Sequence, residues 1–306
     1  MSMNQRPILV FGATGQQGGS VSGALSKAGW PVRAFVRNLS APKALALQAE
    51  GIELVQGTFA DRRALRDAMN GVHGVFSVQP SSPGGTVTDE EEVSMGMAIA
   101  DLAAEAGVDH LVYSSGAAVG DSPTGMGHFD SKARIEAHIR TLPITTTIVR
   151  PAAFMEMLTM PGFGLDKGQF NFFMRPDQAM QFIAVEDIGR FVGAIFADPS
   201  RFVGETFEIA SDQVTGERLE ALFSEAAGRP ITYQRFPEEV LGANQFLAKL
   251  TVLYDDGRLS GEADLDKLRT INPQMMSFAH WLETTGRRLF QQALGTAGSW
   301  EYADKP

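Results

Sequence analysis

Short apolar runs alternate with stretches of helical period between Pro7 and Pro151. Gly, Pro, Asp or Asn bounds each run, and this alternation is typical of a parallel sheet with helices on both faces. The runs predict six strands, at Ile8 to Phe11, Val32 to Val36, Ile52 to Val55, Gly74 to Val78, His110 to Ser114 and Thr145 to Val149. The stretches between them predict helices at about 16–28, 40–50, 61–70, 88–106 and 129–141, of which Asp61 can cap the third. Right-handed crossovers then give a doubly wound α/β fold with a ligand crevice at the carboxyl ends of the strands.

The alternation loosens after Arg150, which predicts a second, smaller α/β lobe. Pro151 to Asp177 mixes Met, Phe and Gly without a clear period. Beyond it we expect helices at about 186–197, Glu217 to Ala227 and Pro237 to Leu253, strands at Glu205 to Ile209 and Ile231 to Phe236, and an apolar helical face over Phe278 to Phe290. The predicted domains are residues 1–150, with the doubly wound sheet, and residues 151–306, with some segments of the lobe returning to that sheet.

Three glycines, Gly12, Gly15 and Gly18, follow the first predicted strand and lead into the first predicted helix. In this context the first glycine allows a tight turn, the second lets the backbone approach a diphosphate, and the third lets helix and sheet pack closely. The free amides of the helix N-terminus then face the phosphates. We therefore expect a dinucleotide on this turn, with Thr14, Gln16 and Gln17 beside it. The alternative is a glycine-rich turn without a ligand.

The residue after the second predicted strand is Arg37, where NAD-binding proteins usually carry a carboxylate for the ribose hydroxyls. A guanidinium instead offers charge-assisted hydrogen bonds to a 2′-phosphate, and Asn38, Ser40 and Lys43 follow closely. This pattern favours NADP(H) as the cofactor. The alternative is that Arg37 and Lys43 are solvated surface charges. Thr58 and Phe59 follow the third predicted strand, where an adenine would contact them.

Composition narrows the remaining possibilities. The chain has 26 Lys and Arg against 36 Asp and Glu, a net charge of −10 and no evident basic face, which disfavours direct nucleic-acid binding. It contains no cysteine, so disulfides, thiolate metal sites and a cysteine nucleophile are excluded. The five histidines show no ligand spacing, and we expect no metal site. No apolar run approaches the ~20 residues of a membrane span, and the start of the chain is polar. We expect a cytoplasmic protein without a signal peptide.

A second set of polar residues follows the fifth predicted strand. Tyr113-Ser-Ser-Gly116 ends that strand, and His128 and Lys132 lie four residues apart at the start of the next helix, on one face of it. This layout resembles the short-chain dehydrogenase/reductase superfamily, in which a Ser and a Tyr-x-x-x-Lys pair polarise a carbonyl and relay a proton. The resemblance implies Ser115 and Lys132 as catalytic groups, with Lys132 holding the nicotinamide ribose. His128 replaces the Tyr, either as a proton donor or as a residue packed beside the cofactor.

Several segments together resemble the NmrA-like family of atypical short-chain reductases. They are Gly12 to Val21, Arg37-Asn38, His128 to Lys132, Arg150 to Glu156, Val185 to Gly189, Asn272-Pro273 and His280 to Glu283. The resemblance implies a Rossmann lobe, a small C-terminal lobe, NADP(H) and often no intact Tyr catalyst. It places Ser77, Val78 and Gln79 beside the nicotinamide ribose, and Pro151 to Phe154 over the nicotinamide ring.

Two functions stay open at this point. Phe154, Met155, Met157, Phe163, Phe170, Phe172 and Phe173 suggest a site for a flat aromatic or quinone substrate, and hence an NADPH-dependent reductase. The same residues can equally form core or a partner surface. The alternative is a regulator that senses the NADPH/NADP ratio through a protein partner, with the loop Ser81 to Thr86 as its mobile element. The sequence leaves the oligomeric state open.

Overall fold

The computed structural model describes residues 6–120 and 122–295, so the polar start of the chain and its last residues lie outside the description. The described residues form two compact units. The first unit holds the chain up to Pro123, then Gly127–Arg150 and Val185–Phe207. The second unit holds Thr124–Met126, Pro151–Ala184 and the chain from Glu208 onward. None of the helices in the described ranges has the length and apolar composition of a membrane span.

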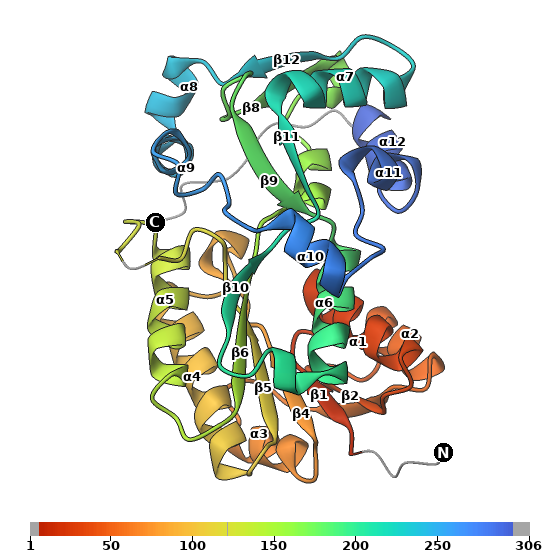
Figure 1. Ribbon diagram of the computed structural model, residues 1–306, viewed down its shortest axis with the longest axis vertical. Coiled ribbons are helices and arrows are strands. Elements are labelled where there is room, and N and C mark those ends of the chain that lie inside the picture. The colour runs from red at the N-terminus through yellow and green to blue at the C-terminus, as the bar shows by residue number, and fades with distance from the viewer. Residues whose placement is uncertain (1–5, 121, 296–306) are drawn as a thin grey trace. The chain divides into compact units, whose positions relative to one another are not determined.

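The first unit is built on a seven-stranded sheet with the order β10-β6-β5-β4-β1-β2-β3 (Figure 1). Its strands are β1 Ile8–Val10, β2 Val32–Val36, β3 Glu53–Gln56, β4 Gly74–Ser77, β5 His110–Ser114, β6 Thr146–Pro151 and β10 Thr206–Ile209. The neighbouring strands in the series β6-β5-β4-β1-β2-β3 all pair in parallel. The chain builds outward from β1 through β2 to β3, then returns to place β4 on the other side of β1. This reversal is the topological switch point of a doubly wound sheet and confirms the expected fold class.

Helices cover both faces of this sheet (Figure 1). One face carries α1 Gln16–Lys27, α2 Pro42–Ala49 and α6 Val185–Ala197, and the other carries α3 Arg62–Met69, α4 Asp89–Glu105 and α5 Gly127–Ile139. Short 3₁₀ turns lie at η1 Ser82–Gly84 and η4 Pro199–Arg201. The predicted strands and helices before Pro151 are confirmed to within a few residues. Asp61 caps α3 as expected, since its carboxylate accepts the Arg63 and Ala64 amides.

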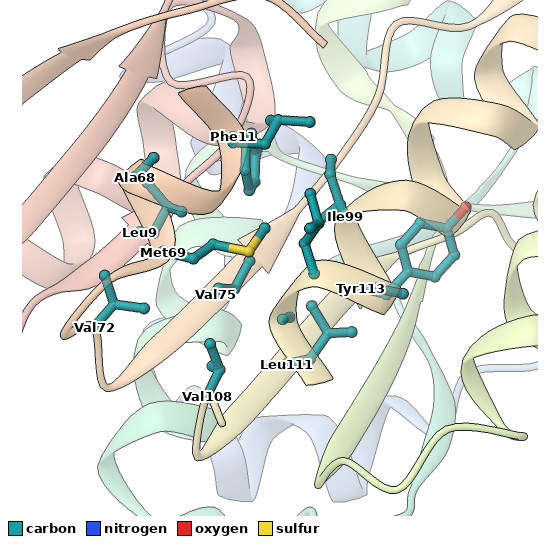
Figure 2. Close-up of a cluster of buried hydrophobic side chains, with 14 of the residues drawn as sticks. Leu9, Phe11, Ala68, Met69, Val72, Val75, Ile99, Val108, Leu111 and Tyr113 are labelled. Carbon is teal, nitrogen blue, oxygen red and sulfur yellow. The ribbon is translucent and has the colours of Figure 1, made fainter. Parts of the chain in front are cut away.

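One hydrophobic core of the first unit lies between the sheet and the helices α3, α4 and α5. Figure 2 shows Met69 from α3 and Ile99 from α4 among the strand residues Leu9, Val75 and Leu111, all at most 1% exposed. Such close-packed aliphatic side chains supply most of the free energy that holds the layers together. The core thereby fixes the strand ends from which the candidate site is built.

The helices α1 and α6 approach each other closely on the opposite face. A Cβ atom on Gly189 would lie 2.5 Å from the Ser20 carbonyl oxygen, and the Ser20 hydroxyl donates to the Glu186 carbonyl oxygen at 3.3 Å. Only glycine fits this crossing. The segment Val185 to Gly189 was singled out by family resemblance alone, and the structure gives its glycine a packing reason. α6 therefore belongs to the first unit although it follows residue 150, and the first two residues of β10, Thr206 and Phe207, belong to that unit as well.

The second unit contains two small sheets and several helices. Its strands are β7 Ala153–Phe154, β9 Ala179–Ile183 and β11 Asp212–Thr215 in one sheet, with β8 Gln169–Phe172 and β12 Thr232–Arg235 in the other. Its helices are α7 Gly216–Ala227, α8 Glu238–Ala243, α9 Gln245–Asp255, α10 Leu265–Ile271, α11 Phe278–Glu283 and α12 Arg287–Gly295, with 3₁₀ turns η2 Met155–Thr159 and η3 Leu165–Lys167. The helical stretch predicted from Pro237 to Leu253 is confirmed with one interruption, because Asn244 ends α8 and caps α9 through the Leu247 amide.

His110 on β5 is buried and its pKa is lowered. Its Nε2 lies 2.8 Å from the Thr147 hydroxyl oxygen, which donates its own proton to the Phe202 carbonyl, so Nε2 carries the imidazole hydrogen. Burial, with a smaller contribution from His73, lowers the pKa of His110 from 6.5 to about 4. The unfolded chain therefore takes up a proton as the pH falls below 6.5 while the folded chain does not.

We expect this difference to remove stability progressively between pH 6.5 and pH 4, by up to about 3 kcal/mol at the acid end. Urea unfolding from pH 4 to 7.5 measures the slope. His110→Gln keeps an N–H donor for Thr147 but does not titrate, so it should flatten the slope. An NMR titration in which His110 of the folded protein protonates near pH 6.5 would contradict this account.

Candidate functional site

The glycine turn after β1 is tightly packed, because two of its glycines have no room for a side chain. Gly12 has φ +65°, and a Cβ added to it would lie 2.9 Å from Val78 Cγ1. A Cβ on Gly18 would lie 2.3 Å from the Gly12 carbonyl oxygen. The Gly15 amide donates to that same oxygen at 2.8 Å. Backbone therefore packs directly on backbone around Gly12, which leaves the outer surface of the turn open for a close approach.

The helix α1 begins directly at this turn without a side-chain cap. Gly15 is its N-cap residue, and among the described residues no side chain caps the amides of the first turn. Gly15 and Gln16 are exposed and Thr14 is partly exposed. Uncapped amides at the start of a helix of twelve residues, approached by glycines, form a site suited to an anion such as a diphosphate. Gln17 has a different contact, because its side-chain oxygen accepts the Ser114 hydroxyl at 2.6 Å and so ties α1 to the end of β5.

The loop after β2 presents Arg37 to solvent. Asn38 orders this loop, since its side-chain oxygen accepts both the amide and the hydroxyl of Ser40 at 2.9 and 2.8 Å. Gln56 at the end of β3 donates to the Arg37 carbonyl oxygen at 3.2 Å. Arg37 itself is exposed, and within residues 6–120 and 122–295 its guanidinium has no acidic partner. An ordered backbone thus carries a cation that is available for an anionic ligand, with exposed Lys43 on the first turn of α2.

Phe59 lies after β3, where we expected contact with an adenine. Its ring packs against Phe11 and Phe35, with centroids 5.9 and 6.3 Å apart, and it remains partly exposed. Thr58 is exposed, and its carbonyl oxygen accepts the Asp61 amide. One side of Phe59 is therefore held by the core, and its contact with an adenine stays a prediction.

The end of β4 meets the glycine turn directly. Val78 lies against Gly12, and Gln79 donates to the buried Ser77 hydroxyl at 2.8 Å. The residues expected beside the nicotinamide ribose thus lie next to the turn expected to hold the diphosphate. The sheet order explains this, because β4 is the neighbour of β1.

Lys132 on α5 forms a buried ion pair that sequence reasoning missed. Its Nζ donates to Glu92 Oε1 at 2.5 Å, to the Ser81 hydroxyl at 3.1 Å and to the His128 carbonyl oxygen at 3.1 Å. Glu92 is 1% exposed, and its second oxygen accepts the hydroxyls of Ser81 and Ser131. A carboxylate on the apolar face of a predicted helix was the available signal, because such a group needs a charged partner.

His128 is held in an environment that keeps it neutral. Its ring packs on Phe129 with centroids 4.0 Å apart. Burial, then the charge of Lys132, lowers the pKa of His128 to about 4, against opposing contributions from Asp89 and Asp130. At neutral pH the imidazole therefore carries no extra proton to donate. Tyr113 is no substitute for the missing Tyr, since its side chain is buried and burial, with Glu92 and Glu136, raises its pKa well above 10.

Ser115 lies beside a second buried ion cluster. Glu136 on α5 accepts two hydrogen bonds from Arg150, at 2.9 and 2.7 Å, and one from Arg140 at 2.7 Å. Burial works against ionisation of Glu136, but Arg150, the nearby Ser115 hydroxyl and Arg140 hold its pKa below the ordinary value. Ser115 is 4% exposed, so the structure places it beneath the surface next to this cluster. Its catalytic role stays a prediction.

Pro151 and Phe154 belong to the second unit, and their contact with a nicotinamide stays a prediction. The phenylalanines that suggested an aromatic pocket are instead core. Phe163, Phe170, Phe172 and Phe173 are at most 6% exposed and pack on one another and on residues such as Phe223 and Tyr254. Met155 is also fully buried, whereas Met157 is 43% exposed. Most of the proposed aromatic lining is therefore unavailable to a substrate.

The known proteins reported below as similar to this chain point to one family, but their names give different activities. The model of the family described as NmrA-like matches residues 4–277. The chain is 30% identical over 262 residues to an NmrA-like family domain-containing oxidoreductase, malD, of Malbranchea aurantiaca, covering 77% of each protein. It is 31% identical over 229 residues to the NAD(P)H azoreductase of Xenophilus azovorans, covering 74% of this chain and 76% of the relative. The crystal structure of NmrA, a negative transcriptional regulator, in complex with NADP has the same fold, with a TM-score of 0.78, 22% identity and coverage of 95% and 98%.

Proposed function

This chain belongs to the NmrA-like family, and we propose that it is an NADP(H)-binding reductase of a small quinone-like or aromatic molecule. The observation that carries the proposal is the pairing of an uncapped glycine turn with the exposed Arg37 one strand away, which has no acidic partner in the described ranges. The first-turn amides of Gln16, Gln17 and Gly18 would hold the diphosphate, and Arg37 would hold the 2′-phosphate. Asn38 and Lys43 border that phosphate, and Phe59 contacts the adenine.

The nicotinamide end of the cofactor is assigned to the ends of β4 and β5. Ser77, Val78 and Gln79 flank the ribose, and the Lys132 ammonium binds one of its hydroxyls. The bound cofactor supplies the hydride, so the chain itself must orient the two reactants and exclude water. The absence of a Tyr at position 128 is compatible with such a reaction.

The names of the relatives support a reductase. Two of them are an oxidoreductase and an azoreductase, and each covers about three quarters of this chain. The alternative is a regulator that senses the NADPH/NADP ratio. The burial of Phe163, Phe170 and Phe172 favours this alternative, because it removes much of the aromatic substrate site.

One experiment separates the two functions. NADPH oxidation is followed at 340 nm with a panel of quinones and azo dyes, and size-exclusion profiles are compared in NADPH and in NADP. Oxidation with a quinone or dye, without a change of oligomer, is the result expected of a reductase. The absence of turnover with every acceptor, together with a change of oligomer between NADPH and NADP, would replace it by the sensor.

His128 is expected to contribute little to turnover, because its lowered pKa leaves it neutral at pH 7. His128→Ala should reduce kcat less than about tenfold, which is below the roughly hundredfold or more that a general acid contributes. Steady-state rates from pH 5.5 to 8.5 measure the effect. A loss of about a hundredfold or more, with unchanged NADPH affinity, would make His128 the proton donor after all.

A further inference from the structure

Every N–H of the Lys132 ammonium is occupied in this structure. An ammonium has three hydrogens to donate, and Lys132 directs them to Glu92, Ser81 and the His128 carbonyl oxygen. The network closes on itself, because the Ser81 hydroxyl accepts from Lys132 and donates to Glu92 at 3.0 Å. A ribose hydroxyl can bind this ammonium only by replacing one of the three partners.

The three partners differ in how readily they can be replaced. Displacing Glu92 from the ammonium would leave a carboxylate that is 1% exposed without its counter-charge, which is strongly unfavourable. The His128 carbonyl belongs to the same helix as Lys132 and moves only with the backbone. Ser81 is a neutral hydroxyl on the partly exposed loop between β4 and α4. It is therefore the partner that can leave.

Ser81 also has the chemistry of the ligand that would replace it. Its group at Lys132 is an aliphatic hydroxyl that accepts one hydrogen bond, and a ribose hydroxyl presents the same group. If the Ser81 hydroxyl turns away from Lys132, its hydrogen bond to Glu92 keeps the loop attached to α4. Thr88 and Glu91 hold the other end of the loop through a capping box. The exchange therefore needs a local adjustment at Ser81.

We propose that Ser81 occupies the place of a ribose hydroxyl on Lys132 in the cofactor-free chain and competes with the dinucleotide for it. This inference rests on the proposed binding of NADP(H) with its nicotinamide ribose at Lys132. Glu92 is the positioning residue that holds the ammonium in place during the exchange. Ser81 then sets the affinity for the cofactor: the chain gives up one hydrogen bond to a charged group each time the cofactor binds.

The direction in which one substitution changes the NADPH affinity tests this competition. Ser81→Ala removes the competitor and should tighten NADPH binding roughly tenfold to a hundredfold, as the loss of one hydrogen bond to a charged group in the free state implies. A serine with a purely structural role would give weaker or unchanged binding when removed. Fluorescence titration of the intact protein with NADPH measures the affinity. Ser94→Ala, at an exposed serine on the neighbouring α4, is the matched control and should leave the affinity unchanged.

A second comparison shows whether the effect passes through Lys132. In a Lys132→Met background the Ser81→Ala substitution should no longer tighten NADPH binding, because the ammonium for which both hydroxyls compete is gone. If the native protein binds NADPH but Ser81→Ala weakens or does not change the affinity, the competition is overturned while the proposed function stands. If the tightening persists in the Lys132→Met background, Lys132 is not the shared partner and the inference fails. If the native protein takes up no NADPH, the proposed function and the inference fall together.

Discussion

Gly18→Ala is expected to weaken NADPH binding on the order of a hundredfold and to lower the stability of the first unit. The added Cβ would lie 2.3 Å from the Gly12 carbonyl oxygen, 2.4 Å from the Gly12 carbonyl carbon and 2.7 Å from the Ala13 amide nitrogen. All three atoms are backbone, so no flexible side chain can move aside to relieve the contact. The turn and the start of α1 must separate. The first-turn amides then no longer point toward one phosphate position.

Gly23→Ala is the matched control, since Gly23 lies on the same helix with nothing within 4 Å of an added Cβ. It should leave NADPH affinity unchanged and stabilise the protein by about 0.5 to 1 kcal/mol, as alanine does in a helix interior. Urea unfolding and calorimetric titration of both variants measure the two effects. Native affinity in Gly18→Ala would show that the dinucleotide does not depend on this turn.

Arg37→Glu is expected to cost roughly a hundredfold to a thousandfold in NADPH affinity while changing NADH affinity less than about threefold. The substitution removes charge-assisted hydrogen bonds to the 2′-phosphate and adds repulsion between two anions. NADH lacks that phosphate, so it serves as an internal control for damage to the rest of the site. Glu at this position can also accept the ribose hydroxyls, as acidic residues at the end of the second strand do in NAD-binding folds.

The change in net charge needs its own control, because NADPH is an anion and the chain already carries −10. Arg218→Glu makes the same change at an exposed position on α7 of the second unit, and it should leave both affinities nearly unaltered. Titrations of the three proteins at one ionic strength give the comparison. Equal losses for NADPH and NADH in Arg37→Glu would mean that Arg37 does not bind the 2′-phosphate.

The sheet and the glycine turn could be predicted from the sequence because the rules that govern them are local. A buried parallel strand produces a continuous apolar run, and the tight turn at Gly12, with φ +65°, selects glycine whatever lies elsewhere in the chain. The exposed position of Arg37 follows from its place directly after a strand. Predicting these features does not require knowing which helices pack against one another.

The interior of the second unit and the partners of Lys132 could not be predicted in the same way. Phe170 and Phe172 fill a core, yet phenylalanines that line a pocket produce the same sequence pattern. Glu92 lies forty residues before Lys132, and only the packing of α4 on α5 brings their charges together. Asn244 interrupts an apolar helical pattern because its side chain caps the next helix. In each case tertiary packing decides among structures that the local sequence permits equally.

We propose that this chain binds a phosphorylated nicotinamide dinucleotide through the glycine turn and Arg37. Isothermal titration calorimetry of the intact protein with NADPH, then with NADH at the same ionic strength, tests it most directly. We expect saturable binding of NADPH that is clearly tighter than the binding of NADH. The absence of heat with NADPH, or a preference for NADH, would contradict it.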